Sequence, residues 1–520
     1  MSLRTIAIGL DGCSWNVLEP LLATGELPHL SALCAEGAHG VLESTVPFFT
    51  GPAWASFATG ASPAAHGIYD FMMLRPEGRL SVARQSDLRR LTYYQQLGRE
   101  GRRSVLVNLP IDQDGCDGAV IVNSWLTDGD ARRILPIGKR ERYRYLLEAY
   151  RTFPRQTGDV EELCAIEQAR FDLARELFLG EEWDHFFVLF SSTDWLGHAM
   201  TGKFLRGDEG AAAAMLRLYK QLDRHIGWLR EHAPDALMVV LSDHGQCEER
   251  AVVRVNSALQ RAGLIEEMSG GDAAPSPFFV DRRSARQSQI KLPAFVGRTR
   301  AMRGLRPMAL AAKRALASQG VNVTAASPRV DRLASAAFSP TDASFAVYLG
   351  ANEHGTASLE RARDALLDLR LDDGTAAIEH VWTPEELYGR PCEGELQPAL
   401  LFSPVIGVRP SAALKRPLVH HVFGGRGCHQ RDGIVILHGG PVAPTELAPS
   451  SICDVAPTLL WAMEAGMPVN GDGRILFEAF QLAYAAVQPV REVEEAFVPP
   501  TMSDEDTTEV NRRLKALGYI

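Results

Sequence analysis

The strongest constraint on the fold comes from short apolar runs that recur along the chain and are separated by much longer stretches of helical character. Each run is rich in β-branched or aromatic residues and shows no alternation between polar and apolar positions. Such runs are typical of strands buried on both faces, as in a mostly parallel sheet covered by helices. The sequence therefore predicts an α/β fold with strands near 5–10, 104–109, 119–122, 185–190, 237–241 and 433–437.

Polar residues follow three of the predicted strands at the point where each strand ends. Asp11 follows the first strand, and Asp194 comes within four residues of the end of the fourth. Asp243 and His244 follow the fifth strand. Because open α/β sheets bind ligands at the carboxyl ends of their strands, we expect these side chains to meet at one edge of the sheet.

Composition and charge exclude several classes of protein. The formal charge of −10 provides no field that would attract a polyanion, so no nucleic-acid polymer is expected as a partner. No apolar run reaches the roughly 18 residues needed to cross a bilayer, and the N-terminus has no secretory apolar region. Eight cysteines in 520 residues form no CxxC pair and indicate reduced thiols. We therefore expect a cytoplasmic protein without a membrane partner.

The composition of the sequence changes in its second half. Within 282–332, twelve Lys and Arg residues are accompanied by a single acidic residue, Asp331. This segment is either a positive lid over an anionic substrate or a solvated pair of basic helices. We predict a catalytic core over 1–268 and 395–490, an inserted cap subdomain over 269–394, and an acidic tail with a short helix over 491–520.

Two pairs of acid and histidine have the spacing of metal ligands. Asp194 and His198 in STDWLGHAM are four residues apart, which places them on one face of a helical turn where both can bind one ion. Asp243 and His244 in LSDHG lie where a predicted buried strand reaches a glycine. Either pair alone is more often a surface or turn feature, so neither is specific by itself.

Asp11 in GLDG and His429 in GGRGCHQRDG supply a third carboxylate and a third imidazole. His429 lies in a glycine-rich loop just before a predicted strand, and His420, His421 and His438 nearby compete with it for the ligand role. Six such ligands suit two Zn²⁺-like ions better than one. Two ions about 4 Å apart can hold the attacking and leaving oxygens of an in-line displacement. The pattern therefore predicts phosphoryl transfer.

Thr50 in PFFTGPAW is the candidate nucleophile. It precedes Gly51, Pro52 and a helical pattern, so it is expected at or near a helix N-cap. A threonine hydroxyl is inert at neutral pH until a base or a metal activates it. The start of a helix also offers free N–H groups to the oxygens of a transferred group. The alternative is that Thr50 only caps the helix.

As an ordered set, these motifs resemble the alkaline phosphatase superfamily and, within it, the type I phosphodiesterase/nucleotide pyrophosphatase branch. The resemblance covers most of the chain and is carried by IGLDG, TGPAWASFATGASPAAHGIYDF, DWLGH, SDHG, GCHQRDGI and ICDVAPTLLWAMEAGMPVNGDGR. It implies an alkaline-phosphatase-like α/β core in which helices sandwich a mostly parallel sheet, with an inserted cap.

The resemblance also implies a role for each matched residue. Thr50 would be the nucleophile that forms a covalent phospho-enzyme, and His66 and Asp454 would be structural elements of the fold. Two divalent ions are implied as cofactors, Zn²⁺ with Mn²⁺ as the alternative. One ion would be held by Asp194, His198 and His429, and the other by Asp11, Thr50, Asp243 and His244.

The sequence departs from the nucleotide pyrophosphatases of this branch at two places. Phe71 stands where those enzymes carry an asparagine that contacts a phosphoryl oxygen, and Ala53 and Trp54 stand where they carry Asn-His. HGIYDF looks more like bacterial and archaeal members described only as phosphohydrolases or phosphomutases. Asn108, Trp54 and Phe71 are candidates for substrate binding; the alternatives are backbone bonding for Asn108 and core packing for the two aromatic residues.

The leading hypothesis is a two-metal phosphohydrolase that cleaves phosphodiester or pyrophosphate bonds of a small phosphorylated substrate through a phospho-threonine intermediate. A phosphomutase or phosphotransferase, with the basic cap excluding water, is the first alternative. A sulfatase is disfavoured because Trp54 stands where the formylglycine signature needs arginine. A non-catalytic binding module would be expected to lack ligands, whereas all seven positions are filled.

Overall fold

The computed structural model describes most of the chain, including every candidate site residue. Within the described part, no helix is both long enough and apolar enough to span a bilayer. Most of the basic segment and most of the acidic tail lie outside the described part, so their roles stay predictions. The described residues are 3–75, 78–127, 133–268, 290–292, 323–325, 330–350, 356–392, 396–494, 510 and 512–514.

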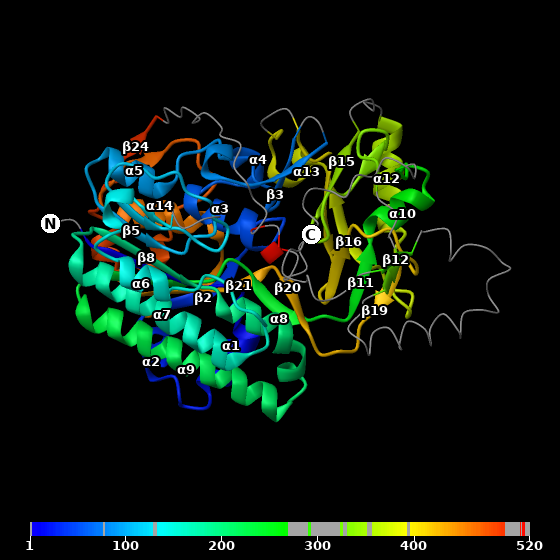
Figure 1. Cartoon of the computed structure of the whole chain (residues 1–520). Coiled ribbons are helices and arrows are strands. Elements are labelled where there is room, and N and C mark those ends of the chain that lie inside the picture. Colours follow the sequence, from blue (N-terminus) through cyan, green and yellow to red (C-terminus); the bar gives the residue numbers. More distant parts are fainter. Residues whose placement is uncertain are drawn as a thin grey trace.

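A nine-stranded sheet forms the centre of the larger part of the molecule (Figure 1). Its strands are, in spatial order, β22 (Thr445–Ser451), β2 (Ala38–Glu43), β21 (Asp432–His438), β9 (Leu237–Leu241), β1 (Thr5–Leu10), β8 (His185–Phe190), β5 (Ser104–Val107), β6 (Ala119–Val122) and β7 (Ile134–Leu135). β1 is parallel to β8 and β9, whereas β21 is antiparallel to β9 and β2. All six predicted strands are present, and the mostly parallel α/β fold is confirmed.

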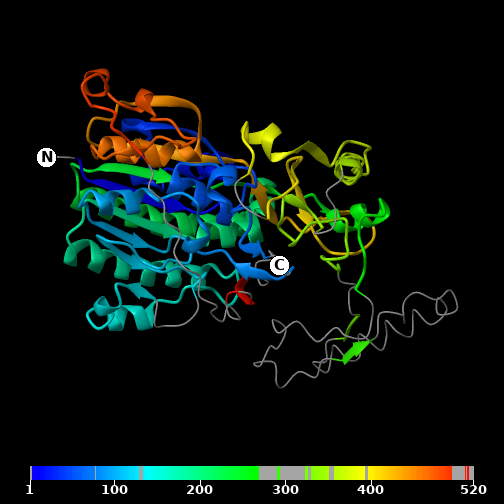
Figure 2. The same ribbon diagram turned by 90° about the horizontal axis from the view of Figure 1, so that it is seen from above.

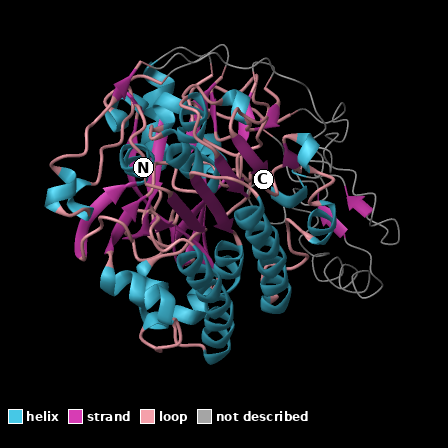
Figure 3. Ribbon diagram, turned by 90° about the vertical axis from the view of Figure 1, so that its left-hand side faces the viewer, coloured by secondary structure: helices cyan, strands magenta, loops and turns pink. Residues whose placement is uncertain are grey.

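Helices cover both faces of this sheet, which is why its strands are apolar on both sides (Figure 3). In β1, Ile6 and Ile8 belong to the core on one face, and Ala7 between them belongs to the core on the other. The first core also contains residues of α1 (Trp15–Leu22), α2 (Pro28–Glu36), α7 (Val160–Gly180) and α9 (Glu209–His232). The second contains residues of α3 (Thr50–Thr59), α5 (Tyr93–Arg99) and α14 (Val455–Ala462).

Aspartate caps fix the starts of the two longest helices, α7 and α9. Asp159 accepts hydrogen bonds from the backbone N–H groups of Glu161 and Glu162, and Asp208 accepts one from Ala211. A cap of this kind typically stabilises a helix by about 1 kcal/mol. The caps therefore help to define where the chain enters the helical layer on this face.

A smaller part with its own apolar core lies beside the carboxyl edge of the large sheet (Figure 2). It contains the four-stranded sheet β14 (Ala337–Phe338), β15 (Ala346–Leu349), β17 (Leu400–Pro404) and β16 (Ile378–Trp382) and the three-stranded sheet β18 (Val408–Ser411), β11 (Ala251–Arg254) and β19 (Val419–His421). Helices α10 (Val255–Arg261) and α12 (Thr356–Leu367) pack on it. The core takes in residues on both sides of the predicted 269–394 cap, whose exact bounds stay a prediction.

A two-stranded antiparallel ribbon, β10 (Gly245–Glu248) with β20 (Gly427–Gln430), connects the two parts next to helix α8 (Ser192–Leu205). Cys247 and Cys428 are register partners in this ribbon, with their Sγ atoms 3.6 Å apart. All eight cysteines are free thiols.

The remaining described α-helices and strands are short. They are α4 (Pro63–His66), β3 (Met72–Leu74), β4 (Leu80–Val82), α6 (Arg144–Ala149), β12 (Ile290–Leu292), β13 (Val323–Ala325), α13 (Pro384–Tyr388), β23 (Met467–Pro468), α15 (Leu482–Ala485) and β24 (Glu492–Val493).

Candidate active site

The carboxyl ends of β1, β8 and β9 meet at one edge of the large sheet, and an acidic residue follows each of them. Asp11 comes directly after β1, Asp194 lies in the first turn of α8, and Asp243 lies two residues beyond β9. All three side chains are buried. The three strands are parallel neighbours with β1 in the middle, so the strand order brings these carboxylates together.

Asp11, Asp243 and His244 form one cluster, here called the Asp11 cluster. The Nε2 atom of His244 lies 3.2 Å from Asp243 Oδ2 and 3.9 Å from Asp11 Oδ1. The opposite ring nitrogen, Nδ1, lies 3.1 Å from the carbonyl oxygen of Gly245. A proton on Nδ1 donated to that carbonyl leaves Nε2 as the ligand atom facing the carboxylates.

Asp194, His198 and His429 form a second cluster, here called the Asp194 cluster. The Nε2 atoms of His198 and His429 lie 3.4 Å and 3.5 Å from Asp194 Oδ1. His198 Nδ1 lies 3.2 Å from the carbonyl oxygen of Gly427, which again leaves Nε2 for the cluster. One carboxylate oxygen of Asp194 and the Nε2 atoms of both histidines therefore lie close enough together to bind one ion.

The two clusters are adjacent, and Thr50 lies against one of them. The ring centroids of His244 and His429 are 4.0 Å apart. The hydroxyl oxygen of Thr50 lies 3.4 Å from His244 Nε2. Thr50 is buried as the first residue of α3, one position after the N-cap Phe49, so it lies near the N-cap and does not occupy it. The free N–H groups of this helix start lie in the same region.

His429 differs from its predicted setting because it lies on strand β20 and not in a loop. Its register partner is Gln246 on β10, and its imidazole lies beside His198 of α8. The competing histidines are placed elsewhere: His421 pairs with Asp372, His438 pairs with Glu36, and His420 is exposed. The structure therefore brings only His429, of these four, to the clusters.

Burial shifts the pKa values of three residues of the two clusters. Burial and the charges of Asp243 and Asp194 raise the pKa of Asp11 well above its usual value. Burial also lowers the pKa of His244 to about 4 and that of His429 to about 3. Both imidazoles are therefore neutral at pH 7, which is the form that binds a cation.

Two carboxylate oxygens of the Asp11 cluster indicate what the site can hold. Asp11 Oδ1 and Asp243 Oδ2 are buried and have no hydrogen-bond partner. A buried, unpaired carboxylate oxygen costs free energy unless a cation compensates it. Carboxylate oxygens combined with neutral imidazole nitrogens form the donor set of Zn²⁺ and, with more oxygen, of Mn²⁺. The residues present therefore fit divalent metal ions.

Gln246 is a site residue that the sequence did not reveal. Its Nε2 donates to Asp194 Oδ1 at 2.7 Å and to the Asp194 carbonyl at 3.0 Å, and its Oε1 accepts from Thr201 at 2.8 Å. Gln246 thus fixes the carboxylate that both histidines of the Asp194 cluster approach. The only feature of the sequence that could have indicated this role is the position of Gln246, two residues after His244. A glutamine near the start of a strand does not by itself predict a functional site.

Asn108 is placed in the interior by its own hydrogen bonds. Its Nδ2 donates to the Leu189 carbonyl and to Ser191 Oγ, both at 2.9 Å, and its Oδ1 accepts from Tyr150 at 3.3 Å. These bonds hold the chain where β8 ends, just before α8. They give Asn108 a structural role, and its contact with substrate stays a prediction.

Trp54 and Phe71 are packed in the two apolar cores. Trp54 is fully buried, with its ring centroid 5.4 Å from that of Phe57 and 5.8 Å from that of Phe187. Phe71 packs against Phe49 and Trp125 at 5.6 Å and 5.5 Å. These contacts match the packing alternative for both residues, so the predicted pocket-lining role gains no support from the geometry.

His66 and Asp454 make the kind of contacts expected of structural residues. His66 Nε2 lies 3.0 Å from Ser56 Oγ, and His66 Nδ1 accepts from the N–H of Ile68 at 3.1 Å. Asp454 accepts from the N–H groups of Ser451 and Arg474 at 2.9 Å and 2.8 Å. Both side chains tie loops to the helix that carries Thr50 or to its neighbour.

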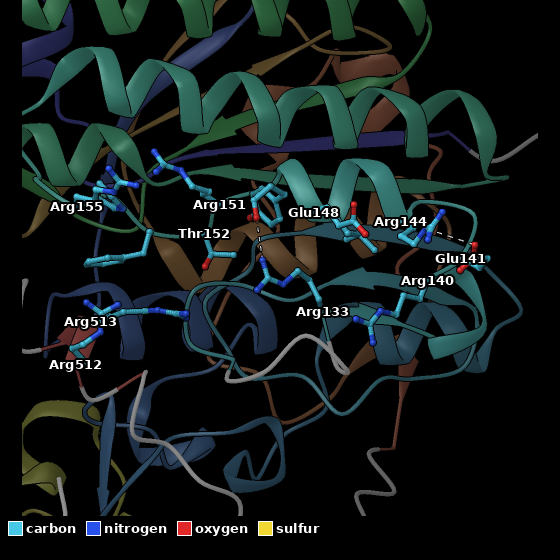
Figure 4. Close-up of a pocket in the computed structure, with 14 residues that line it drawn as sticks. Arg133, Arg140, Glu141, Arg144, Glu148, Arg151, Thr152, Arg155, Arg512 and Arg513 are labelled. Carbon is cyan, nitrogen blue, oxygen red and sulfur yellow. Dashed lines mark hydrogen bonds and ion pairs between the residues drawn. The ribbon is translucent and has the colours of Figure 1, made fainter. Parts of the chain in front are cut away.

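A small cavity opens onto the Asp194 cluster, and a larger one lies away from both clusters. The small cavity has a volume of about 120 Å³, and His198 and His429 form part of its wall. The larger cavity, of about 1020 Å³, contains no cluster residue (Figure 4). Its wall is rich in arginine: Arg133, Arg140, Arg144, Arg151, Arg155, Arg512 and Arg513. We therefore expect the reaction to take place at the smaller cavity, which contains two cluster residues.

The mostly parallel sheet, with two acid and histidine clusters at its carboxyl edge, defines an α/β protein with a candidate metal site. The chain belongs to the type I phosphodiesterase / nucleotide pyrophosphatase family, whose model matches residues 5–302. That match spans every candidate ligand except His429. Family membership supports phosphoester hydrolysis as the general class of reaction, and the family is metal-dependent.

Two solved structures share the fold at low sequence identity. Phosphonoacetate hydrolase from Sinorhizobium meliloti 1021, in complex with phosphonoacetate, is 16% identical with a TM-score of 0.56, over 89% of this chain and 96% of that chain. Murine ectonucleotide pyrophosphatase / phosphodiesterase 5 is 13% identical with a TM-score of 0.50, over 90% of this chain and 97% of that chain. At these identities the likeness concerns the fold.

Proposed function

We propose that this protein is a two-metal phosphohydrolase that cleaves phosphodiester or pyrophosphate bonds of a small substrate through a phospho-threonine at Thr50. The observation that carries the proposal is the position of the Thr50 hydroxyl, 3.4 Å from His244 Nε2 of the Asp11 cluster, which adjoins the Asp194 cluster. A buried hydroxyl that only capped its helix would not need an imidazole of a ligand cluster beside it.

The residues would hold two divalent ions, Zn²⁺ with Mn²⁺ as the alternative. Asp194, His198 and His429 would bind one, and Asp11, Asp243, His244 and Thr50 would bind the other. When bound, such cations lower the pKa of a hydroxyl and stabilise the charge of oxygens at a phosphoryl group.

The chain's own groups then define the reaction. The Thr50 hydroxyl releases its proton to solvent and its oxygen attacks phosphorus, the bond from phosphorus to the leaving oxygen breaks, and that oxygen keeps the electron pair. The N–H groups at the start of α3 are available to the phosphoryl oxygens. Water subsequently cleaves the phospho-threonine, which restores the Thr50 hydroxyl and releases the phosphorylated product.

Metal dependence and the fate of water oxygen test this proposal. We expect the full chain to bind about two equivalents of Zn²⁺ or Mn²⁺ and to release p-nitrophenol from bis(p-nitrophenyl) phosphate in a chelator-sensitive way. In ¹⁸O-water the label should appear at phosphorus. Turnover that survives complete removal of metal would refute the metal assignment, and an unlabelled phosphoryl product would point to transfer to another hydroxyl.

A further inference from the structure

Two arginines border the small cavity beside the Asp194 cluster. Arg409 lies on β18, and Arg426 comes immediately before β20. Both line the cavity of about 120 Å³ whose wall also contains His198 and His429. Cationic side chains thus share one small space with two of the candidate metal ligands.

A single buried carboxylate, that of Glu249, holds both guanidinium groups. Arg409 Nε donates to Glu249 Oε1 at 3.1 Å, and Arg426 Nε lies 3.8 Å from Glu249 Oε2. The Glu249 side chain is 5% exposed, whereas those of Arg409 and Arg426 are 35% and 61% exposed. The backbone N–H of Glu249 also donates to the Arg426 carbonyl at 2.9 Å. Glu249 and Arg426 are therefore held together by this backbone bond and by their side-chain ion pair.

The charges of this group do not balance. Two guanidinium groups share one carboxylate, which leaves one net positive charge at the wall of the cavity. Each arginine directs Nε toward Glu249, and Arg409 Nη1 also donates to the Pro410 carbonyl at 3.2 Å. Within the described part of the chain, Arg409 Nη2 and the terminal amino groups of Arg426 remain for a second anion. A planar guanidinium binds a carboxylate or a phosphate through two parallel hydrogen bonds, and a fixed one loses less entropy on binding.

The position of the cavity relative to Thr50 assigns it to the leaving group. Thr50 contacts His244 of the Asp11 cluster, whereas the cavity opens onto His198 and His429 of the Asp194 cluster. In an in-line displacement the leaving oxygen departs on the side of phosphorus opposite the nucleophile. A leaving group therefore extends toward Arg409 and Arg426.

We propose that Arg409 and Arg426 form a subsite for a carboxylate or phosphate group carried by the leaving group of the substrate, with Glu249 as their positioning residue. This inference rests on the proposed function and narrows it to small phosphoesters whose leaving alcohol bears a second negative charge. A space of about 120 Å³ is well below the volume of sites for drug-sized ligands, so the leaving group is small.

Three ethyl aryl phosphates test this subsite. Their aryl groups carry, at the para position, a carboxylate, a phosphonate or an uncharged carboxamide. We expect the full metal-loaded chain to prefer the charged esters, and Arg409→Gln or Arg426→Gln to lower the ratio of kcat/KM for charged over neutral ester about tenfold, mainly through KM. The two charged esters distinguish carboxylate from phosphate recognition.

Arg206→Gln is the matched control, because Arg206 is an exposed arginine that pairs with Glu248, directly next to Glu249, and does not line the cavity. It should leave the selectivity ratio unchanged. Arg409→Lys should lie between wild type and Arg409→Gln, since it keeps the charge and loses the planar fork. The proposal would be overturned if wild type showed no preference for the charged esters, or if the arginine variants lost kcat/KM equally for all three esters.

Binding of the free leaving groups separates this inference from the proposed function. Calorimetric titration with 4-hydroxybenzoate, 4-hydroxyphenylphosphonate and 4-hydroxybenzamide requires no turnover. We expect an anion to bind wild type about tenfold more tightly than Arg409→Gln or Arg426→Gln. If no ester is hydrolysed but this difference is found, the proposed function fails and the anion subsite stands. Equal binding by wild type and variants would remove the subsite even in an active hydrolase.

Discussion

The Nε2 atoms of His198 and His429 lie 3.0 Å apart, although the two residues are 231 positions apart in the chain. Helix α8 packs this closely against strands β20 and β10 because Gly427 on β20 and Gly197 on α8 carry no Cβ. A Cβ atom at Gly427 would lie 2.4 Å from the carbonyl oxygen of Gly197, and a Cβ at Gly197 would lie 1.7 Å from Gln246 Oε1. The backbone contact thus directs both imidazoles at one point.

Removal of His429 should abolish one of two metal sites. We expect His429→Ala to bind about one equivalent of Zn²⁺ where wild type binds about two, because the Asp194 cluster is left with two ligands and a catalytic zinc typically needs three. Elemental analysis after gel filtration measures this. His438→Ala, which affects only a surface pair with Glu36, should keep two equivalents. Equal stoichiometry in wild type and His429→Ala would contradict the ligand assignment.

Gln246 should affect metal affinity without being a ligand. Gln246→Leu removes the bond to Asp194 Oδ1, and loss of such an orienting contact usually weakens metal binding by about 10- to 100-fold. Competition with a zinc-binding dye measures the affinity of the Asp194 cluster. Gln430→Leu, on the neighbouring strand β20, should have little effect. Unchanged affinity in Gln246→Leu would show that Asp194 is oriented without this amide.

Thr50 should be required for turnover but not for metal binding at the Asp194 cluster. We expect Thr50→Ala to lower kcat for bis(p-nitrophenyl) phosphate at least about a hundredfold, because it removes the attacking oxygen, and Thr50→Ser to keep measurable activity, because it keeps a hydroxyl. Mass spectrometry of acid-quenched protein should detect a phosphoryl group on Thr50. Thr59→Ala in the same helix is the control. Full activity of Thr50→Ala would exclude it as nucleophile.

The parts of the fold that the sequence predicted are those set by local pattern. Strands such as 5–10 and 185–190 are continuous apolar runs because helices cover both faces, and this leaves a clear mark in the sequence. The small sheets β18-β11-β19 and β10-β20 were not predicted. Their strands are three or four residues long and only partly apolar, and their partners come from segments more than 150 residues away.

Most candidate ligands were predictable because Asp11, Asp243 and His244 follow strands and Asp194 and His198 have helical spacing, whereas the residues that support them were not. Asp194 and His198 are visible as a pair, but Gln246 and Glu249 act only after β10 has paired with β20. Arg409 and Arg426 look like ordinary surface arginines until one carboxylate joins them. Long-range pairing, and not residue type, creates these contacts.

Asp70 should make stability depend on pH. Burial raises the pKa of Asp70 to about 7, although it accepts hydrogen bonds from Thr341 and from the N–H of Met72. Since the folded state then binds more protons than the unfolded state between about pH 4 and 7, the free energy of unfolding falls as pH rises through this window and levels off above it. Relative to Asp70→Asn, wild type should lose about 2 to 3 kcal/mol between pH 5 and 8.

Denaturant unfolding at pH 5 and pH 8 measures this difference for wild type and Asp70→Asn, both loaded with metal. Asp235→Asn at an exposed position serves as the control and should follow wild type at both pH values. A wild type that gains stability relative to Asp70→Asn as pH rises would mean that the hydrogen bonds outweigh burial at this carboxyl.

The buried ion pair of Glu167 and Arg170 should stabilise the helix start that carries Asp194. Both side chains are fully buried in α7, and Glu167 Oε1 accepts from the N–H of Ser192 at 2.8 Å, at the beginning of α8. Glu167→Gln leaves the Arg170 guanidinium uncompensated in the interior, which typically costs about 3 to 5 kcal/mol, whereas exposed pairs contribute about 0 to 1 kcal/mol. We expect Arg217→Gln, which breaks the exposed pair with Glu161, to change the denaturation midpoint little. The double variant Glu167→Gln/Arg170→Met should be more stable than Glu167→Gln alone, because it removes the unpaired charge. A double variant less stable than Glu167→Gln would show that the two residues act independently.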